Sequence, residues 1–80
     1  MTNAFMYYIA VFKPKQSASW TPMYHMDGGT VLSCSAQNAI AKGKELLPFC
    51  VGESAKAGNR FSDTNDWEIG ASKVNYPDLP

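Results

Sequence analysis

The chain has 80 residues and a formal net charge of zero, and 45% of its residues are hydrophobic while 18% are charged. A chain of this length has room for one hydrophobic core, so we expect a single domain over residues 1–80. The composition lies outside the highly charged range of disordered chains. Because nucleic-acid affinity comes mainly from neutralised phosphates, the balanced charge does not favour direct nucleic-acid binding.

The apolar runs in the sequence are short. The longest, residues 4–12, has nine residues, whereas a membrane-spanning helix needs roughly 20. Residues 1–3 carry no basic side chain of the kind that precedes the apolar stretch of a secretory signal. We therefore expect a cytoplasmic protein with no membrane partner, in which both cysteines are reduced.

Residues 5–12 predict the first strand. They are β-branched, aromatic or otherwise apolar at both odd and even positions, which is typical of an interior strand with two covered faces. Pro14 lacks a backbone donor and should end this strand.

A second strand is predicted from Trp20 up to the turn at Asp27, although Pro22 interrupts it near its start. One face would carry Trp20, Tyr24 and Met26, and the other Thr21, Met23 and His25. The sequence Asp27-Gly28-Gly29 then predicts a tight turn, because a two-residue primed turn requires the positive φ that glycine adopts freely. The third strand should run from about Thr30 to Cys34, antiparallel to the second.

The clearest periodicity in the chain predicts one helix between Ser35, a suitable N-cap, and Pro48, which should end it. Apolar residues recur every three or four positions and form one stripe: Ala36, Ala39, Ile40, Gly43, Leu46 and Leu47. Gly43 would let the helix approach a sheet closely, at a propensity cost of ~1 kcal/mol. Such a helix would hold Cys34 and Cys50 about 20 Å apart, which excludes a disulfide and leaves two buried thiols.

Residues 52–66 show no sustained period and are rich in small polar types. We expect a long polar loop there, and such a loop in a small domain is often mobile or functional. Alternation of apolar with small or polar residues resumes at Trp67 and Ile69 and predicts a last strand, in which the pattern becomes less regular towards Tyr76.

The element order β-β-β-α-β predicts an α+β domain with a four-stranded sheet in the order 3-2-1-4 and one helix on one face. Four apolar residues are expected beneath the helix: Ile9, Val11, Trp67 and Ile69. The other face would then carry Met6, Tyr8 and Phe12 in the open. An open aromatic face is typical of an interaction surface, unless loops and the tail fold over it.

Five residues are predicted to contact a protein partner: Tyr8, Phe12, Asp63, Asp66 and Glu68. The carboxylates are included because charge is segregated along the chain. Residues 1–60 have six Lys and Arg against three Asp and Glu, and residues 61–80 have one against four. Segregated charge can orient docking, although a solvated loop gives the same pattern. A second copy, forming a homodimer through the open face, is the other partner that we consider.

The residue patterns do not predict catalysis, a metal or a cofactor. His25 is the only histidine, and no pair of Cys or His has ligand spacing. A thiol nucleophile would need Cys34 or Cys50 beside His25, and nothing local supports that arrangement. The pair Gly28-Gly29 lacks the following helix and lysine of a phosphate-binding loop. A small enzyme or nucleotide-binding domain is therefore ranked third among our hypotheses, after the two binding functions described next.

Residues 7–47 resemble the β-β-β-α core of HicB-type antitoxins. The similar segments are Tyr7-Tyr8-Ile9-Ala10-Val11-Phe12, the aromatic strand from Trp20 with its glycine turn, and the helical segment from Ser35 to Leu46. This resemblance implies an antitoxin that neutralises a small toxin.

The small size, the lone domain and the order of sheet and helix are also similar to small phage-encoded inhibitors such as anti-CRISPR proteins. This resemblance is one of architecture. It implies a non-enzymatic protein that inhibits a larger host protein or nucleoprotein by surface contact, in the cytoplasm of a host cell. It is our first hypothesis, because it requires no motif that the sequence lacks.

Overall fold

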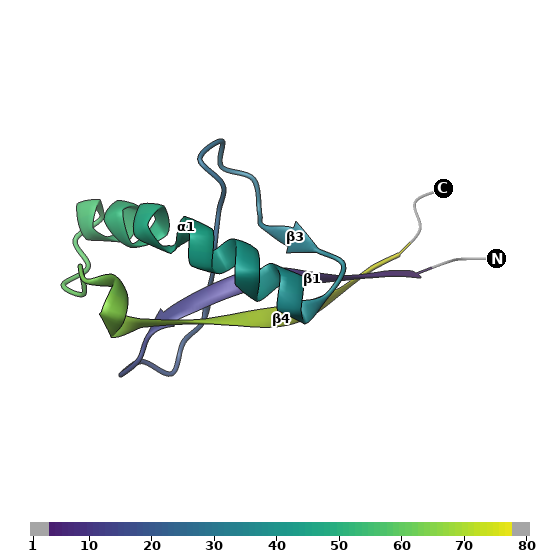
Figure 1. The fold of residues 1–80 in the computed structure, drawn as a ribbon, viewed down its shortest axis with the longest axis horizontal. Coiled ribbons are helices and arrows are strands. Elements are labelled where there is room, and N and C mark those ends of the chain that lie inside the picture. Colours follow the sequence, from purple (N-terminus) through teal and green to yellow (C-terminus); the bar gives the residue numbers. More distant parts are fainter. Residues whose placement is uncertain (1–3, 78–80) are drawn as a thin grey trace.

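The computed structural model describes residues 4–77, and the side chains of residues 7–74, as one sheet with a long helix on one face (Figure 1). Its elements are β1 (Ala4–Pro14), β2 (Thr21–Pro22), β3 (Leu32–Ser33), α1 (Ala36–Lys56), the 3-10 helix η1 (Thr64–Asp66) and β4 (Trp67–Pro77). The predicted α+β class, with a four-stranded antiparallel sheet and one helix, is confirmed.

β1 is the central strand, as predicted, and β4 lies beside it. The two strands are antiparallel and pair over eleven residues. On its other edge, β1 pairs with β2 near Phe12 and with β3 near Ile9. The third strand, which we expected outside the second, therefore also pairs directly with β1, and β2 and β3 lie one after the other along the same edge.

Three residues join these strands at one point. The amide of Ala10 donates to the carbonyl of Val31 (3.1 Å), the amide of Met23 donates to the carbonyl of Ala10 (2.9 Å), and the amide of Val31 donates to the carbonyl of Met23 (3.4 Å). All three residues are fully buried. The chain between Met23 and Val31 leaves the sheet at this point.

The predicted placement of Tyr8 and Phe12 on the open face is wrong. Phe12 is 6% exposed and belongs to the core under α1, and Tyr8 packs against the same core. A Cβ added at Gly43 would lie 3.4 Å from the Cβ of Ala10, so this face of β1 meets the helix. The closest approach of α1 therefore falls on the smallest side chain of the strand, and the aromatic residues lie on either side of it.

The open face carries Ile9 and Val11, which we expected beneath the helix. The two residues line a hollow together with Trp20, and the Trp20 ring lies over Gly70. The loop after β1 thus covers part of this face. The prediction for Met6 falls outside the residues whose side chains the structure describes. On β4 the placement is confirmed, because the core under α1 includes its apolar residues Trp67 and Ile69.

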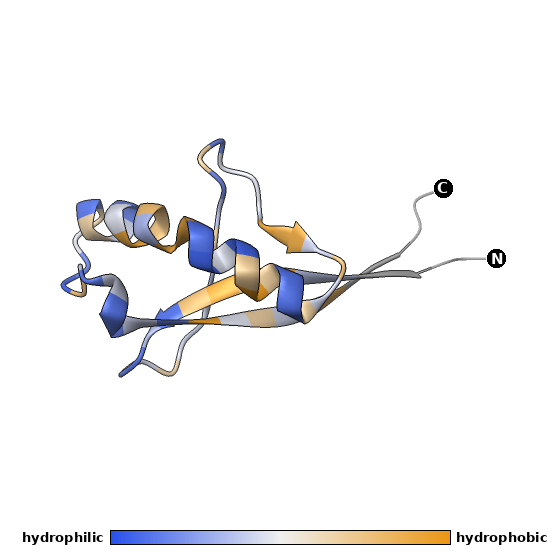
Figure 2. Cartoon of the chain, in the orientation of Figure 1, coloured by the Kyte–Doolittle hydropathy of each residue, from blue (hydrophilic) through white to orange (hydrophobic). Residues whose placement is uncertain are grey.

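The start and the buried face of α1 are confirmed. Ser35 is the N-cap, and its Oγ accepts a hydrogen bond from the amide of Asn38 at 3.1 Å. Ala39 and Gly43 are buried at the centre of the predicted stripe. Polar residues occupy the outer side of α1, and β1 is mostly hydrophobic (Figure 2).

Replacing Ser35 by alanine should lower the free energy of unfolding by about 1 kcal/mol, because an amide in the first turn of α1 loses its acceptor. Thermal or urea unfolding followed by circular dichroism would measure the change. Ser62→Ala, at an exposed site outside α1, is the matched control and should change stability by less than about 0.5 kcal/mol. Equal losses in both variants would contradict the capping role.

The end of the helix is predicted wrongly, because α1 continues through Pro48 to Lys56. The expected polar loop over residues 52–66 therefore begins only after Lys56. A proline inside a helix removes a hydrogen bond and crowds the preceding turn, at a cost of about 3 kcal/mol. Cys50 and Val51 are buried in the core just after it, and their packing offsets this cost.

Gly58, and not Pro48, marks where the helix ends. Its φ is +101°, and its amide donates to the carbonyl of Ala55 at 3.0 Å. The next amide, that of Asn59, reaches back to the carbonyl of Ser54 at 3.1 Å. These two bonds form the usual glycine C-cap. No helix in the described part of the chain, α1 included, is long and apolar enough to span a membrane.

Both cysteine thiols are free, but only Cys50 is buried. Cys34 is exposed, so the prediction that both are buried is wrong for this residue. Cys34 follows a two-residue strand at the sheet edge and precedes the N-cap Ser35. Cys50, by contrast, belongs to the buried core cluster.

Candidate functional site

Residues 23–31, which we call the hairpin arm, leave the sheet between β2 and β3 and rise past α1 (Figure 1). At the tip, the amide of His25 donates to the carbonyl of Gly29, and the carbonyl of His25 accepts from the amide of Gly28, both at 2.8 Å. The turn lies where it was predicted. It is a longer turn with a bulge and not a two-residue primed turn. Of the two glycines, only Gly28 has a positive φ, of +92°.

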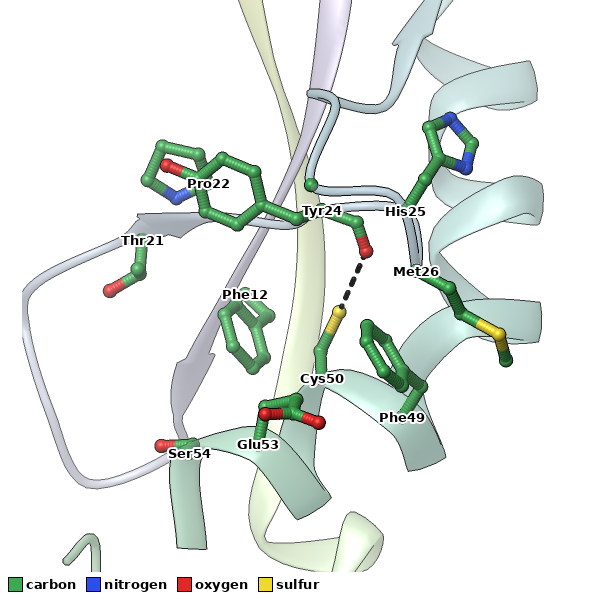
Figure 3. A pocket seen from close by; sticks show the side chains of 11 residues that line it. Phe12, Thr21, Pro22, Tyr24, His25, Met26, Phe49, Cys50, Glu53 and Ser54 are labelled. Atoms are coloured by element: carbon green, nitrogen blue, oxygen red, sulfur yellow. Dashed lines mark hydrogen bonds between the residues drawn. The ribbon is translucent and has the colours of Figure 1, made fainter. Parts of the chain in front are cut away.

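A groove lies between the hairpin arm, the second half of α1 and β1 (Figure 3). Its volume is about 500 Å³. Most of its walls are apolar or aromatic, and they come from Phe12, Pro22, Tyr24, Met26, Phe49 and Cys50. Polar groups complete the lining: Thr21, His25, Glu53 and Ser54, with Gly28 beside them. We call this hollow the arm–helix groove.

Contacts within the core hold the groove in shape. The Phe12 ring stacks on Trp67, with 4.6 Å between the ring centroids. The Cys50 thiol donates to the carbonyl of Tyr24 at 3.5 Å and so links α1 to the arm (Figure 3). Two of the residues that line the groove, Phe12 and Cys50, are therefore fixed in the core.

The hairpin arm exposes large apolar side chains beside the groove. Met26 is 77% exposed and Tyr24 is 45% exposed. Met26 also borders a second hollow on the arm, together with Leu46 of α1. Apolar residues that are exposed singly are common, but a cluster next to an apolar groove is typical of a protein contact site.

The polar residues of the groove do not form a catalytic or metal-binding set. His25 and Cys50 both line it, but the His25 ring points away from Cys50 (Figure 3). Glu53 forms an exposed ion pair with Lys56 at 3.4 Å. Among residues 4–77, no three His, Cys, Asp or Glu side chains lie together in a way that could hold a metal ion. What the groove offers is an apolar floor with hydrogen-bonding groups around it.

The five residues predicted to contact a partner do not lie together. Phe12 lines the groove, and Tyr8 is half-buried on the same face of the sheet. Glu68 belongs to the opposite face, because side chains alternate along a strand. There it forms an ion pair with Lys13, with 2.6 Å between the Glu68 Oε1 and Lys13 Nζ atoms.

The other two predicted residues flank η1. Asp63 is its N-cap and accepts a hydrogen bond from the amide of Asn65 at 2.9 Å. The backbone carbonyl of Asp66 accepts from the amide of Lys15 at 2.8 Å. Both carboxylates are exposed. The Asp63 carboxylate thus has a local structural role in the turn that leads into β4, whereas Asp66 contributes there through its backbone.

Sequence reasoning missed the main elements of the groove, which are Tyr24, Met26 and Phe49. A signal for Phe49 was present, because the apolar stripe continues past Pro48 to Cys50 and places this residue on a helix. A signal for the arm was also present, since large apolar residues flank the turn. What the sequence could not show is that the arm packs beside the second half of α1.

Comparison of the chain with models of protein families, with curated proteins and with solved structures finds no match. The proposed function therefore rests on the geometry of the arm–helix groove and the hairpin arm.

Proposed function

We propose that this chain is a small non-enzymatic binding protein that acts by surface contact on a larger protein or nucleoprotein. The observation that supports this most strongly is the exposure of Met26 and Tyr24 beside a preformed apolar groove. Methionine and aromatic residues are enriched at protein interfaces. Covering them would contribute about 25 cal/mol for each Å² of apolar surface removed from water, against which the entropic cost of association is set.

The more specific function that we propose is inhibition of a host nucleoprotein in the cytoplasm, in the manner of anti-CRISPR proteins. It rests on the resemblance in size and architecture. In this proposal the partner places an apolar side chain in the groove, above Phe12, and surrounds Met26. An antitoxin of the HicB type would use the same surface on a small toxin, and a small enzyme would instead depend on His25 or a cysteine.

A second copy on the open face of the sheet is the other partner that the sequence predicts. On that face Trp20 lies over Gly70, and the Lys13 ammonium lies 5.2 Å from the centre of the Trp20 ring. A hollow of about 420 Å³ remains beside Ile9 and Val11. Because the loop covers part of this face, we propose the hairpin arm, and not the open face, as the main contact.

The proposal is tested by binding and inhibition assays with purified CRISPR effector nucleoproteins and with purified toxins of the kind that HicB-type antitoxins neutralise. Changing Met26 to Asp and Tyr24 to Ser together should weaken binding at least about tenfold, because a few apolar residues usually dominate such an interface. Glu45→Lys, at an exposed site on α1 outside the groove, is the control and should bind like the unmodified chain.

Inhibition of a nucleoprotein that is lost only in the arm variant supports the proposal. Neutralisation of a toxin would replace it with the antitoxin function. Turnover that depends on His25 or Cys50 would replace it with an enzyme. Normal binding by the arm variant would show that the contact surface is elsewhere.

A further inference from the structure

The outer edge of β4 is unpaired in the described part of the chain. β4 has eleven residues and pairs with β1 on its inner edge, and no strand among residues 4–77 lies on the outer one. The opposite edge of the sheet is occupied by β2 and β3 (Figure 1). Monomeric proteins usually shorten, charge or cover a long free edge, because its backbone groups can pair with another strand.

Backbone pairing fixes which residues of β4 face outward. Ala10 of β1 uses its amide and its carbonyl for the two short strands on the far edge. In an antiparallel ladder, residues that bond across alternate with residues that do not. Ala71, the partner of Ala10, therefore points its own N–H and C=O outward. Ile69 and Lys73, two positions to either side, do the same.

The middle of β4 offers little resistance to another strand. Its central residues are Gly70, Ala71 and Ser72, which are small. The charged residues of β4 are Glu68 and Lys73, and its one proline stands at its end. A neighbouring strand at about 4.8 Å would meet no large side chain in the centre of the edge.

We propose that a second copy of this chain pairs antiparallel with β4, about a two-fold axis at Ser72, and joins the two sheets into one. This register overlaps all eleven residues of the strand with themselves. Within the eleven residues it places Glu68 opposite Tyr76 of the copy and Lys73 opposite Ala71 of the copy, so that no like charges lie directly opposite each other in the strand. A symmetric antiparallel pairing of identical strands satisfies the outward groups of both copies at once.

The helices favour the same arrangement. α1 packs on both β1 and β4 and so lies over the pair of them. In two copies joined at β4, the helices would be separated by two strand spacings, about 10 Å, which is a normal distance between packed helices. Helical periodicity places Ile40 and Leu47 on the side of α1 away from the arm–helix groove. Both are apolar and only half-buried, and the second helix would cover them. The hairpin arms would remain free at the two far edges.

The mass of the full chain in solution, measured by light scattering after size exclusion, tests this pairing. We expect a dimer, at twice the 8.8 kDa of one chain. Lys73→Pro removes an outward N–H without removing a bond to β1, so it should give a folded monomer. Ser72→Asp, which places like charges opposite each other on the axis, should also give a monomer if the proline variant does not fold. A monomeric unmodified chain would overturn the proposal.

Cross-linking tests the register. In a chain with Cys34→Ser, the change Ser72→Cys places two thiols opposite each other at a Cα separation of about 4.5 Å, where a disulfide forms readily. We expect a covalent dimer on a non-reducing gel. Glu68→Cys is the matched control, because its copy would lie more than about 10 Å away. Equal cross-linking at both sites, or none at Ser72, would overturn the register. The arm variant at Met26 should dimerise normally, which separates this proposal from the proposed function.

Discussion

Trp67→Ala is expected to lower the free energy of unfolding by about 3–5 kcal/mol. Trp67 is buried at the start of β4, where its ring stacks on Phe12. Its Nε1–H donates to the carbonyl of Phe61 at 3.0 Å, which fixes the chain that leads into the strand. Because a chain of this size is stable by only about 4–12 kcal/mol, the variant should lose a large part of its total stability.

Urea unfolding followed by far-ultraviolet circular dichroism would measure this loss. Trp67→Phe keeps an aromatic ring but removes the donor, so it should cost about 1–2 kcal/mol. Trp20→Ala is the matched control, because Trp20 is 46% exposed and contributes mainly a ring over Gly70 and a cation–π contact with Lys13, worth about 1 kcal/mol. Equal losses at the two tryptophans would show that the core is assigned wrongly.

The elements that the sequence predicts well are those set by local chemistry. Ser35 caps α1 because its side chain suits the amides of the first turn, and an apolar period of three to four residues specifies the buried side of the helix. The pairing of β1 with β4 was also predictable, since an apolar strand needs neighbours on both edges and covers on both faces.

The face of β1 under the helix was not predictable from alternation. Every residue of this strand from Tyr7 to Phe12 is apolar or aromatic, so a shift of one position changes nothing in the pattern. The choice is made by a contact distant in sequence, the approach of Gly43 to Ala10. A helix that comes so close requires the smallest side chain of the strand beneath it.

The candidate site was missed for a similar reason. Pro48 is a strong local signal for the end of a helix, but buried Cys50 and Val51 hold the next two turns in place. That extension carries Phe49 to the hairpin arm and so creates the groove. The predicted acidic residues do not line the groove. Asp63 caps η1, and Glu68 pairs with Lys13 on the opposite face of the sheet.

Two glycines of α1 should respond in opposite directions to the same change. A Cβ at Gly43 would lie 2.9 Å from Cγ2 of Ile69 and 3.1 Å from Sδ of Met23, whereas nothing lies within 4 Å of a Cβ at Gly52. Alanine favours a helix by about 1 kcal/mol over glycine. Gly52→Ala should therefore raise the free energy of unfolding by about 0.5–1 kcal/mol.

At Gly43 the crowding outweighs the gain in helix propensity. Met23 is fully buried, and the Ile69 methyl is fixed close to its own backbone, so neither neighbour can move away without disturbing the sheet. Overpacking of this kind costs about 1–3 kcal/mol, so Gly43→Ala should be destabilising, and Gly43→Leu more strongly so. Urea unfolding of the three variants measures the sign directly. A gain in stability at both glycines would mean that α1 does not approach Ala10 and Ile69 as closely as the structure shows.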